Sequence, residues 1–372
     1  MVADTSARVH DAIDCDVHCL PETLQDLFPY LEDEYWQQYI NTMRGGGRST
    51  TMDGGYPPGM PTSATPAARA AGGPLTAATY EQLKARFLDV AEPQRAILNC
   101  TRFFQATRNP YYTIATSRAL NDWLIHDWLD RDDRLLASLV VPIGDVDGAI
   151  TEIERHGSDP RFVQVLLPIR TAVPYGNKQY DRMLAAIERH GLAIGLHAWG
   201  QAARAPTPSG YVNTYLQDYA ANWQIVQIHV LSLVAEGVFE RYPGLRVSVM
   251  ECGFNWLPSL LWRFDKDWKG LWREVPWLKD KPSTYVRRHF KATTEPAQLP
   301  RDDRQARELL KLVGSDMLMY ASDHPHDHGP SGARLLELLE DDAAEAVLRS
   351  NAASFYRLEA RVPHETAETE AR

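Results

Sequence analysis

Eight short apolar segments recur along the sequence, and a stretch with the spacing of an amphipathic helix follows each of them. They span residues 13–18, 96–100, 135–141, 162–167, 192–197, 245–251, 290–293 and 317–322. Strands that alternate with helices pair in parallel, so this order indicates an α/β protein. Eight such units predict a (β/α)8 TIM barrel, and a doubly wound open sheet is the alternative. No strand is followed by a G-x-G-x-x-G sequence, which weakens the case for a dinucleotide-binding open sheet.

A change in composition interrupts this order after the first strand. Residues 45–78 are rich in Gly, Pro, Ala, Ser and Thr and lack hydrophobic periodicity, which is typical of a loop. Long loops in compact domains are often functional lids. We therefore expect a flexible insertion that is either a lid over the site or a passive loop. The prediction is one barrel domain over residues 1–360, followed by a disordered tail over 361–372.

Charge and hydropathy exclude several classes of protein. The formal net charge is −10 and the chain has no Lys/Arg run, which argues against a nucleic-acid partner. No apolar stretch approaches about 18 residues, so we expect no membrane span. The N-terminus lacks the apolar core of a signal peptide. Four cysteines in a chain of 372 residues indicate a reducing compartment, so we expect a cytoplasmic protein.

The first strand concentrates charge. In the sequence Ile-Asp-Cys-Asp-Val-His at 13–18, strict alternation would place Asp14, Asp16 and His18 on one face. A strand does not bury that much charge without a partner, and a divalent cation binds both carboxylate and neutral imidazole. A solvated polar face or an ion pair remains the alternative for an isolated pattern of this kind.

Polar side chains also end three later strands. His197 ends the fifth, Glu251 the sixth, and Asp323 directly follows the eighth. Active sites of (β/α)8 barrels lie at the C-terminal ends of the strands. Because Asp16 and His18 end the first strand, all five side chains are expected to meet at one mouth of the barrel, where they predict a metal site.

Five motifs span nearly the whole chain in a recognisable order. On these motifs the chain resembles the amidohydrolase superfamily, in the amidohydrolase-related branch that includes aminocarboxymuconate semialdehyde decarboxylase and γ-resorcylate decarboxylase. The motifs are IDCDVH at 13–18, GLH at 195–197, GVFERYPGL at 237–245, ECG-x-x-WLP at 251–258 and YASDHPH at 320–326.

The resemblance implies a barrel that holds one divalent metal ion, with zinc expected first and manganese or iron as alternatives. Its motifs place the ligands at Asp16, His18, His197 and Asp323. Asp323 would also act as the general base, because a carboxylate can take a proton from water that the metal has acidified. Relatives are usually homodimers, so we expect a homodimer here.

One position departs from the family pattern. Decarboxylases of this branch carry a catalytic His at the end of strand six, where this chain has Glu251. A buried carboxylate can shuttle a proton, so we predict Glu251 as a second catalytic residue. Its negative charge would repel a substrate carboxylate beside the metal. The structural alternative for Glu251 is a salt bridge with Arg263 or Arg287.

Four further residues are candidates for substrate binding. They are Trp199, His229, His326 and Arg170. The alternatives are that Trp199 covers the core and that His229 is a packed or surface residue of a helix. For His326 the alternative is that it orients its loop, and for Arg170 that it is a solvated surface charge. We expect two other histidines of the last loop, His324 and His328, to be exposed to solvent, and a secondary metal cluster with His326 is the alternative.

These inferences favour a metal-dependent hydrolase of a small molecule, in which activated water attacks a carbonyl or amide carbon. Asp323 would accept the proton and Glu251 would protonate the leaving atom. The first alternative is a nonoxidative decarboxylase or hydratase of an aromatic or unsaturated carboxylic acid. The second is a barrel that binds a metal or ligand without turnover.

Overall fold

The structure, a computed structural model, describes residues 9–42, 76–101, 109–200, 210 and 212–361. The predicted insertion at 45–78 lies outside the described residues except for its last three. The predicted tail lies outside them except for residue 361.

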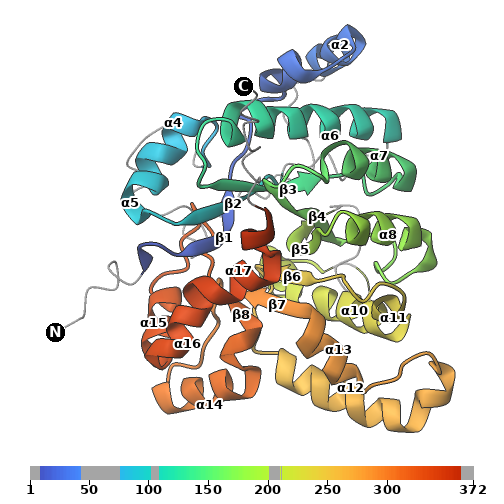
Figure 1. Ribbon diagram of the computed structural model, residues 1–372, viewed down its shortest axis with the longest axis vertical. Helices are drawn as coiled ribbons and strands as arrows, with labels where there is room; N and C mark the ends of the chain where they lie inside the picture. Colours follow the sequence, from blue (N-terminus) through green and yellow to red (C-terminus); the bar gives the residue numbers. More distant parts are fainter. Residues whose placement is uncertain (1–8, 43–75, 102–108, 201–209, 211, 362–372) are drawn as a thin grey trace, which may run out of the picture.

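Eight parallel strands pair in the order β1-β2-β3-β4-β5-β6-β7-β8 (Figure 1). Cys15 N in β1 donates to Tyr320 O at 3.0 Å and His18 N donates to His324 O at 2.8 Å, so β1 also joins the segment after β8. The predicted (β/α)8 barrel is confirmed, and the open-sheet alternative is wrong. The strands are β1 Ile13–His18, β2 Arg95–Asn99, β3 Leu135–Val140, β4 Phe162–Arg170, β5 Ala193–Gly200, β6 Val247–Met250, β7 Phe290–Thr293 and β8 Leu318–Met319.

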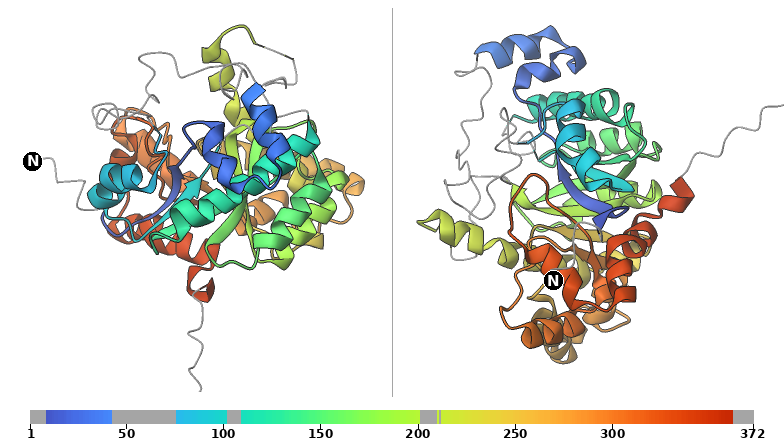
Figure 2. Two further views of the ribbon diagram at one scale, coloured as in Figure 1. Left: turned by 90° about the horizontal axis from the view of Figure 1, so that it is seen from above. Right: turned by 90° about the vertical axis from the view of Figure 1, so that its left-hand side faces the viewer.

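Helices surround the barrel, and α2 lies at the outer edge of the molecule (Figures 1 and 2). None of the helices in the described ranges is long and apolar enough to cross a membrane. The α-helices are α2 Glu34–Thr42, α4 Tyr80–Leu83, α5 Asp89–Ala91, α6 Pro110–Leu124, α7 Val146–His156, α8 Asp181–Arg189, α9 Tyr215–Ala220, α10 Asn222–Ala235, α11 Val238–Arg241, α12 Leu257–Leu271, α13 Pro282–His289, α14 Asp303–Val313, α15 Ser331–Leu338, α16 Asp341–Glu345 and α17 Asn351–Tyr356. Short 3₁₀ or π segments span Leu24–Tyr30, Lys84–Leu88, Ile125–Leu129, Lys178–Tyr180, Trp272–Glu274, Ser315–Met317, Ala346–Ser350 and Leu358–Arg361.

Side-chain caps fix where several of the covering helices begin. The side chains of Asn109, Asp145 and Asp302 accept hydrogen bonds from Tyr112 N, Gly148 N and Gln305 N in the first turns of α6, α7 and α14. These caps satisfy amides that have no partner within the helix. Each helix therefore starts at a defined point after its strand.

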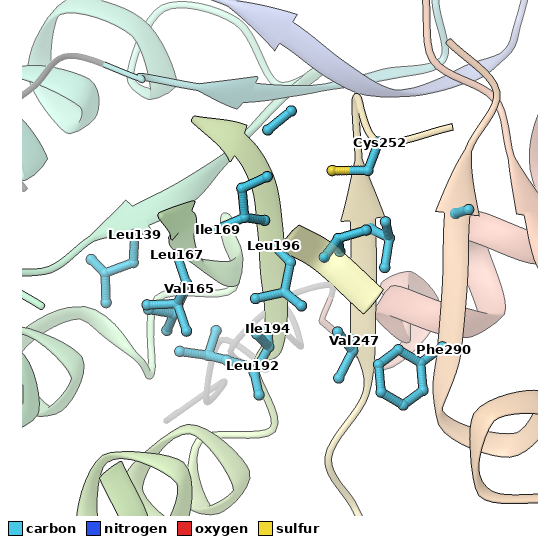
Figure 3. Close-up of a cluster of buried hydrophobic side chains, with 14 of the residues drawn as sticks. Leu139, Val165, Leu167, Ile169, Leu192, Ile194, Leu196, Val247, Cys252 and Phe290 are labelled. Carbon is cyan, nitrogen blue, oxygen red and sulfur yellow. The ribbon is translucent and has the colours of Figure 1, made fainter. Parts of the chain in front are cut away.

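Two apolar clusters fill the part of the protein that the structure describes. The larger lies between the sheet and the helices and includes Leu196, Val247 and Phe290 (Figure 3). The smaller draws residues from six strands and from α17, so it fills the interior of the barrel. Its two aromatic members from α17 are Phe355 and Tyr356, which close the end opposite the strand C-termini.

The strict alternation expected along β1 is wrong. The pairing of β1 with β2 shifts register between Asp14 and Val17. Val17 therefore packs in the outer cluster, whereas Ile13 and Cys15 belong to the interior one. An irregularity of this type inserts an extra residue and re-aims the side chains that follow it.

Candidate metal centre

The strand ends bring the acidic and imidazole groups of the sequence prediction into one buried cluster. His18 ends β1, His197 lies in β5, and Glu251 directly follows β6. Glu251 has a φ of 54° and Asp323 has a φ of 55°. Non-glycine residues rarely adopt this left-handed conformation, and such strain gathers at functional sites.

His18 lies at the centre of the cluster. Its Nε2 is 2.8 Å from Asp323 Oδ1 and 2.9 Å from Glu251 Oε1, and its Nδ1 is 3.1 Å from the carbonyl oxygen of Asn99. Because carbonyl and carboxylate oxygens only accept here, both ring nitrogens of His18 carry protons in this arrangement. A bound cation would replace the proton on Nε2, while the bond from Nδ1 to Asn99 would keep the ring oriented.

The chemistry of the unpaired atoms fits a metal ion. His197 Nε2 lies 3.2 Å from Glu251 Oε1 and 3.6 Å from Asp16 Oδ2. Within the described part of the chain, Asp16 Oδ2 and both ring nitrogens of His197 are buried without a hydrogen-bond partner. Buried polar atoms without partners are costly. A divalent cation among these atoms would satisfy Asp16 Oδ2 and His197 Nε2 together.

Among the residues that the structure describes, two overlapping groups of side chains have the spacing of metal ligands. The first is Asp16, His18, His197 and Glu251, and the second is His18, Glu251, Asp323 and His326. Within each group, the candidate ligand atoms lie within 4.8 Å of one another. The four ligands expected from the sequence are divided between the groups, and Glu251, expected only as a proton shuttle, belongs to both.

Burial and mutual charge shift the pKa values of the cluster in opposite directions. Burial lowers the pKa of His197, but the carboxylates of Glu251 and Asp16 outweigh it and raise that pKa to about 10. The pKa of His18 is also raised, because Asp16, Asp323 and Glu251 outweigh its burial. Burial and Asp323 raise the pKa of Glu251, but the two imidazoles outweigh them and lower it to about 2. Imidazolium charge thus balances the carboxylates where a cation would otherwise do so.

Asp323 is surrounded by imidazoles. Its Oδ1 accepts from His326 Nδ1 at 2.8 Å as well as from His18, and its Oδ2 accepts from His328 Nε2 at 2.5 Å. These three rings outweigh burial and hold the pKa of Asp323 well below its ordinary value. The exposure expected for His324 and His328 is wrong, because both side chains are largely buried beside the site.

Two substrate-binding candidates have internal partners. Arg170 Nη2 donates to Asp218 Oδ2 at 2.9 Å and to Asn222 Oδ1 at 3.0 Å, which ties the end of β4 to α9 and α10. His229 Nε2 donates to Ile169 O at 2.7 Å, and its Nδ1 accepts from Tyr175 N at 3.3 Å. These four hydrogen bonds link Arg170 and His229 to other parts of the protein.

The other positions named from the sequence divide as follows. His326 lies at the cluster through Asp323, whereas the side chain of Trp199 falls outside the described part of the structure. Glu251 does not pair with the arginines proposed as its alternative partners. Arg263 instead pairs with Asp267, and Arg287 donates to the carbonyl of Val313.

Sequence reasoning missed Asn99. It ends β2, its backbone carbonyl accepts from His18 and its Nδ2 donates to Asp16 Oδ1 at 2.8 Å. The signal was present, because Asn99 is a polar residue near the end of an apolar run, as His197 is.

A family profile described as "Amidohydrolase" matches residues 13–358. The chain belongs to this amidohydrolase family. The resemblance drawn from the motifs, including the aminocarboxymuconate semialdehyde decarboxylase-like branch, is confirmed. The chain is 24% identical over 319 residues to γ-resorcylate decarboxylase of Rhodococcus jostii, a match that covers 75% of the chain and 91% of the relative. It is 25% identical over 245 residues to the decarboxylase orsB of Emericella nidulans, covering 60% and 69% of the two chains.

Solved structures show the same fold at lower identity. The 2,6-dihydroxybenzoate decarboxylase from Rhizobium superposes with a TM-score of 0.64 at 21% identity, covering 94% of this chain and 99% of the other. A dihydroxybenzoic acid decarboxylase from Polaromonas with bound manganese and 2-nitroresorcinol gives 0.65 at 19%, with coverages of 95% and 100%. The 5-carboxyvanillate decarboxylase from Sphingomonas paucimobilis gives 0.66 at 21%, with coverages of 93% and 99%.

Proposed function

We propose that this member of the amidohydrolase family is a metal-dependent carboxy-lyase that decarboxylates a hydroxylated aromatic acid without an oxidant. The observation that carries the proposal is the match to γ-resorcylate decarboxylases over 91% of their length, in a chain whose strand ends gather a metal-type cluster. The sequence alone favoured a hydrolase. The relatives support the decarboxylase alternative better, and we adopt it.

The proposed ligands are Asp16, His18, His197 and Asp323, with Glu251 close enough to be a fifth. A divalent cation held there would act as a Lewis acid toward substrate oxygens and lower the pKa of coordinated water. A mixed set of imidazoles and carboxylates suits both zinc and manganese. We propose one of these two, and the manganese in the Polaromonas enzyme supports the latter.

Decarboxylation breaks the bond between the ring and the carboxyl carbon, releases carbon dioxide and places one proton on the ring carbon. The loop after β8 holds protons close to the proposed ligands, because His326 and His328 both donate to Asp323. In this proposal Asp323 passes a proton from this loop to the ring carbon. A positioned group of this kind typically accelerates a reaction about 10²- to 10⁴-fold.

Hydrolysis is the second candidate, and Glu251 favours it. Three carboxylates, from Asp16, Glu251 and Asp323, meet in the buried cluster. With neutral imidazoles, a single divalent cation would leave a net negative charge that repels an anionic acid. A neutral ester, lactone or amide would not meet this repulsion, and Asp323 would then accept a proton from the attacking water.

The test is a substrate panel on protein reconstituted with manganese or zinc. Carbon dioxide release from 2,6-dihydroxybenzoate or 5-carboxyvanillate, abolished in Asp323→Asn, supports the carboxy-lyase. Turnover of neutral esters, lactones or amides without carbon dioxide release would instead identify the hydrolase. Absence of both activities in protein that retains the metal would favour the binding-only alternative.

We also propose that the chain folds as one domain over residues 1–360 and acts in the cytoplasm as a homodimer on a small-molecule substrate. The tryptophans Trp262 and Trp272 are exposed and offer an apolar surface for a second copy, whereas Trp123 and Trp128 are buried. Light scattering coupled to size-exclusion chromatography tests the dimer, and a monomeric mass at micromolar concentration would contradict it.

A further inference from the structure

A line of buried side chains runs through the interior of the barrel from α17 to Asp16. Tyr356 Oη donates to Gln164 Oε1 at 3.1 Å, and Gln164 Nε2 donates to Ser138 Oγ at 2.8 Å. Ser138 Oγ donates to Asn99 Oδ1 at 2.5 Å, and Asn99 Nδ2 donates to Asp16 Oδ1 at 2.8 Å. All five residues are fully buried, and they come from five separate elements.

The donors in this line all point the same way. The carboxylate of Asp16 and the carbonyl of Cys15 can only accept, so both require the Nδ2 side of Asn99. Its Oδ1 then faces two donors, Ser138 Oγ and Gln164 Nε2. Reversing the amide of Asn99 would therefore place its oxygen against the oxygens of Asp16 and Cys15, and its NH2 group against the NH2 group of Gln164.

A glycine makes room for this line. A Cβ at Gly195 in β5 would lie 2.9 Å from the amide of Gln164 and 2.8 Å from Met250 Cε. The sulfur of Met250 in turn lies 3.6 Å from Asn99 Nδ2 and 3.5 Å from Gln164 Nε2. The first residue of the Gly-Leu-His motif thus accommodates the polar line, while the last residue supplies a proposed metal ligand.

We propose that Asn99 is a positioning residue for the metal centre, and that Ser138, Gln164 and Tyr356 fix the sense of its amide. The inference rests on the proposed role of Asp16 as a ligand. Asn99 Nδ2 donates a hydrogen bond to Oδ1 of Asp16. The other oxygen, Oδ2, has no hydrogen-bond partner and faces His197. Asn99 also orients His18 through its backbone carbonyl, so one strand end aligns two ligands.

Substitution of the Asn99 side chain separates these two contacts. In Asn99→Leu the backbone carbonyl that holds His18 is retained, while the donor to Asp16 is lost at nearly constant volume. Loss of a partner that orients a metal ligand typically costs about 10- to 100-fold in metal affinity. The remote variants Ser138→Ala and Tyr356→Phe should weaken affinity by smaller factors in the same direction, because the amide of Asn99 is then less constrained.

The experiment measures binding of Co²⁺ by competition with a chelator, together with the visible absorption spectrum of bound Co²⁺, which reports ligand geometry. Matched controls are Asn121→Leu, at a buried asparagine that bridges α6 and β3, and Tyr285→Phe, at a buried tyrosine on α13. We expect about a 10-fold or greater loss and an altered spectrum in Asn99→Leu, and changes within about twofold in the controls.

Three outcomes separate this inference from the metal centre itself. Wild-type affinity and spectrum in Asn99→Leu, with binding lost in His197→Ala, would overturn the positioning role alone. Wild-type protein that binds no Co²⁺, or binding that survives His197→Ala, would overturn the metal centre and this inference with it. If Asn99→Leu does not fold, unchanged affinity in both Ser138→Ala and Tyr356→Phe would overturn the positioning role.

Discussion

His18 Nε2 and Asp323 Oδ1 lie 2.8 Å apart although 305 positions separate the two residues in the chain. The contact crosses the seam where β1 meets the segment after β8, and His18 N donates to His324 O at the same seam. The segments whose backbone bonds close the barrel therefore also carry two side chains of the site. A change that removes the charge of Asp323 should affect the site without opening the seam, because the backbone bonds remain.

Asp323→Asn is expected to lower metal content and to reduce turnover by at least about 100-fold. The amide is nearly isosteric, but it lacks the negative charge to which the imidazoles of His18, His326 and His328 donate hydrogen bonds. Elemental analysis of the purified protein and steady-state kinetics measure the two effects. Asp327→Asn, at a partly exposed carboxylate of the same loop, is the matched control. Full metal content and full turnover in Asp323→Asn would contradict the assigned role.

Glu251→Gln is expected to lower KM for an anionic aromatic acid while lowering kcat. Burial and Asp323 favour protonation of Glu251, but the neighbouring imidazoles lower its pKa to about 2, so it remains charged at neutral pH. Removal of that charge relieves repulsion of a substrate carboxylate. Steady-state kinetics at saturating metal test this, with Glu251→Asp as the variant that keeps the charge. An unchanged KM would show that Glu251 does not repel the substrate.

The sequence predicted the barrel because strand-length apolar runs and helical spacing repeat eight times. It also pointed to Asp16, His18, His197 and Asp323, because each lies at or just beyond the end of an apolar run. The register shift in β1 could not be predicted, since it depends on pairing with β2 rather than on the residues of β1.

The site residues that the sequence analysis did not predict differ in whether a sequence pattern could have revealed them. Asn99 could have been found by the rule that selected His197, because it too lies near the end of an apolar run. His328 could not, because its burial against Asp323 depends on the path of the loop after β8. Gln164 and Ser138 lie within apolar runs, and only the closed barrel reveals that they face one another.

Arg170 and Asp218 are expected to couple in stability and not in substrate binding. Their ion pair is partly buried, with Nη2 and Oδ2 2.9 Å apart. A double-mutant cycle of Arg170→Met and Asp218→Asn should give a coupling of about 1 kcal/mol in the free energy of unfolding. KM should change little in either variant. If Arg170 instead binds the substrate carboxylate, Arg170→Met would raise KM about tenfold or more, whereas Asp218→Asn would not.

His229 is expected to make stability depend on pH in a defined interval. Burial is the main cause that lowers its pKa from 6.5 to about 4, and its bond to Ile169 O only partly opposes this. Between these values the unfolded chain binds a proton that the native protein does not bind. Stability from this group is therefore present above about pH 6.5 and is lost as the pH falls toward about 4. From about pH 7 to about pH 5 the loss amounts to roughly 2 kcal/mol.

Urea unfolding of wild type and His229→Gln at the two pH values isolates this contribution. Glutamine keeps a donor for the carbonyl of Ile169 but does not titrate, so the variant should lose less stability than wild type over the interval. His126→Gln, at an exposed histidine in the segment Ile125–Leu129 that follows α6, controls for the effect of a His-to-Gln substitution. Equal losses of stability in wild type and His229→Gln would mean that His229 also binds the proton in the native protein. The contacts of His229 with Ile169 and Tyr175 would then have to open at low pH.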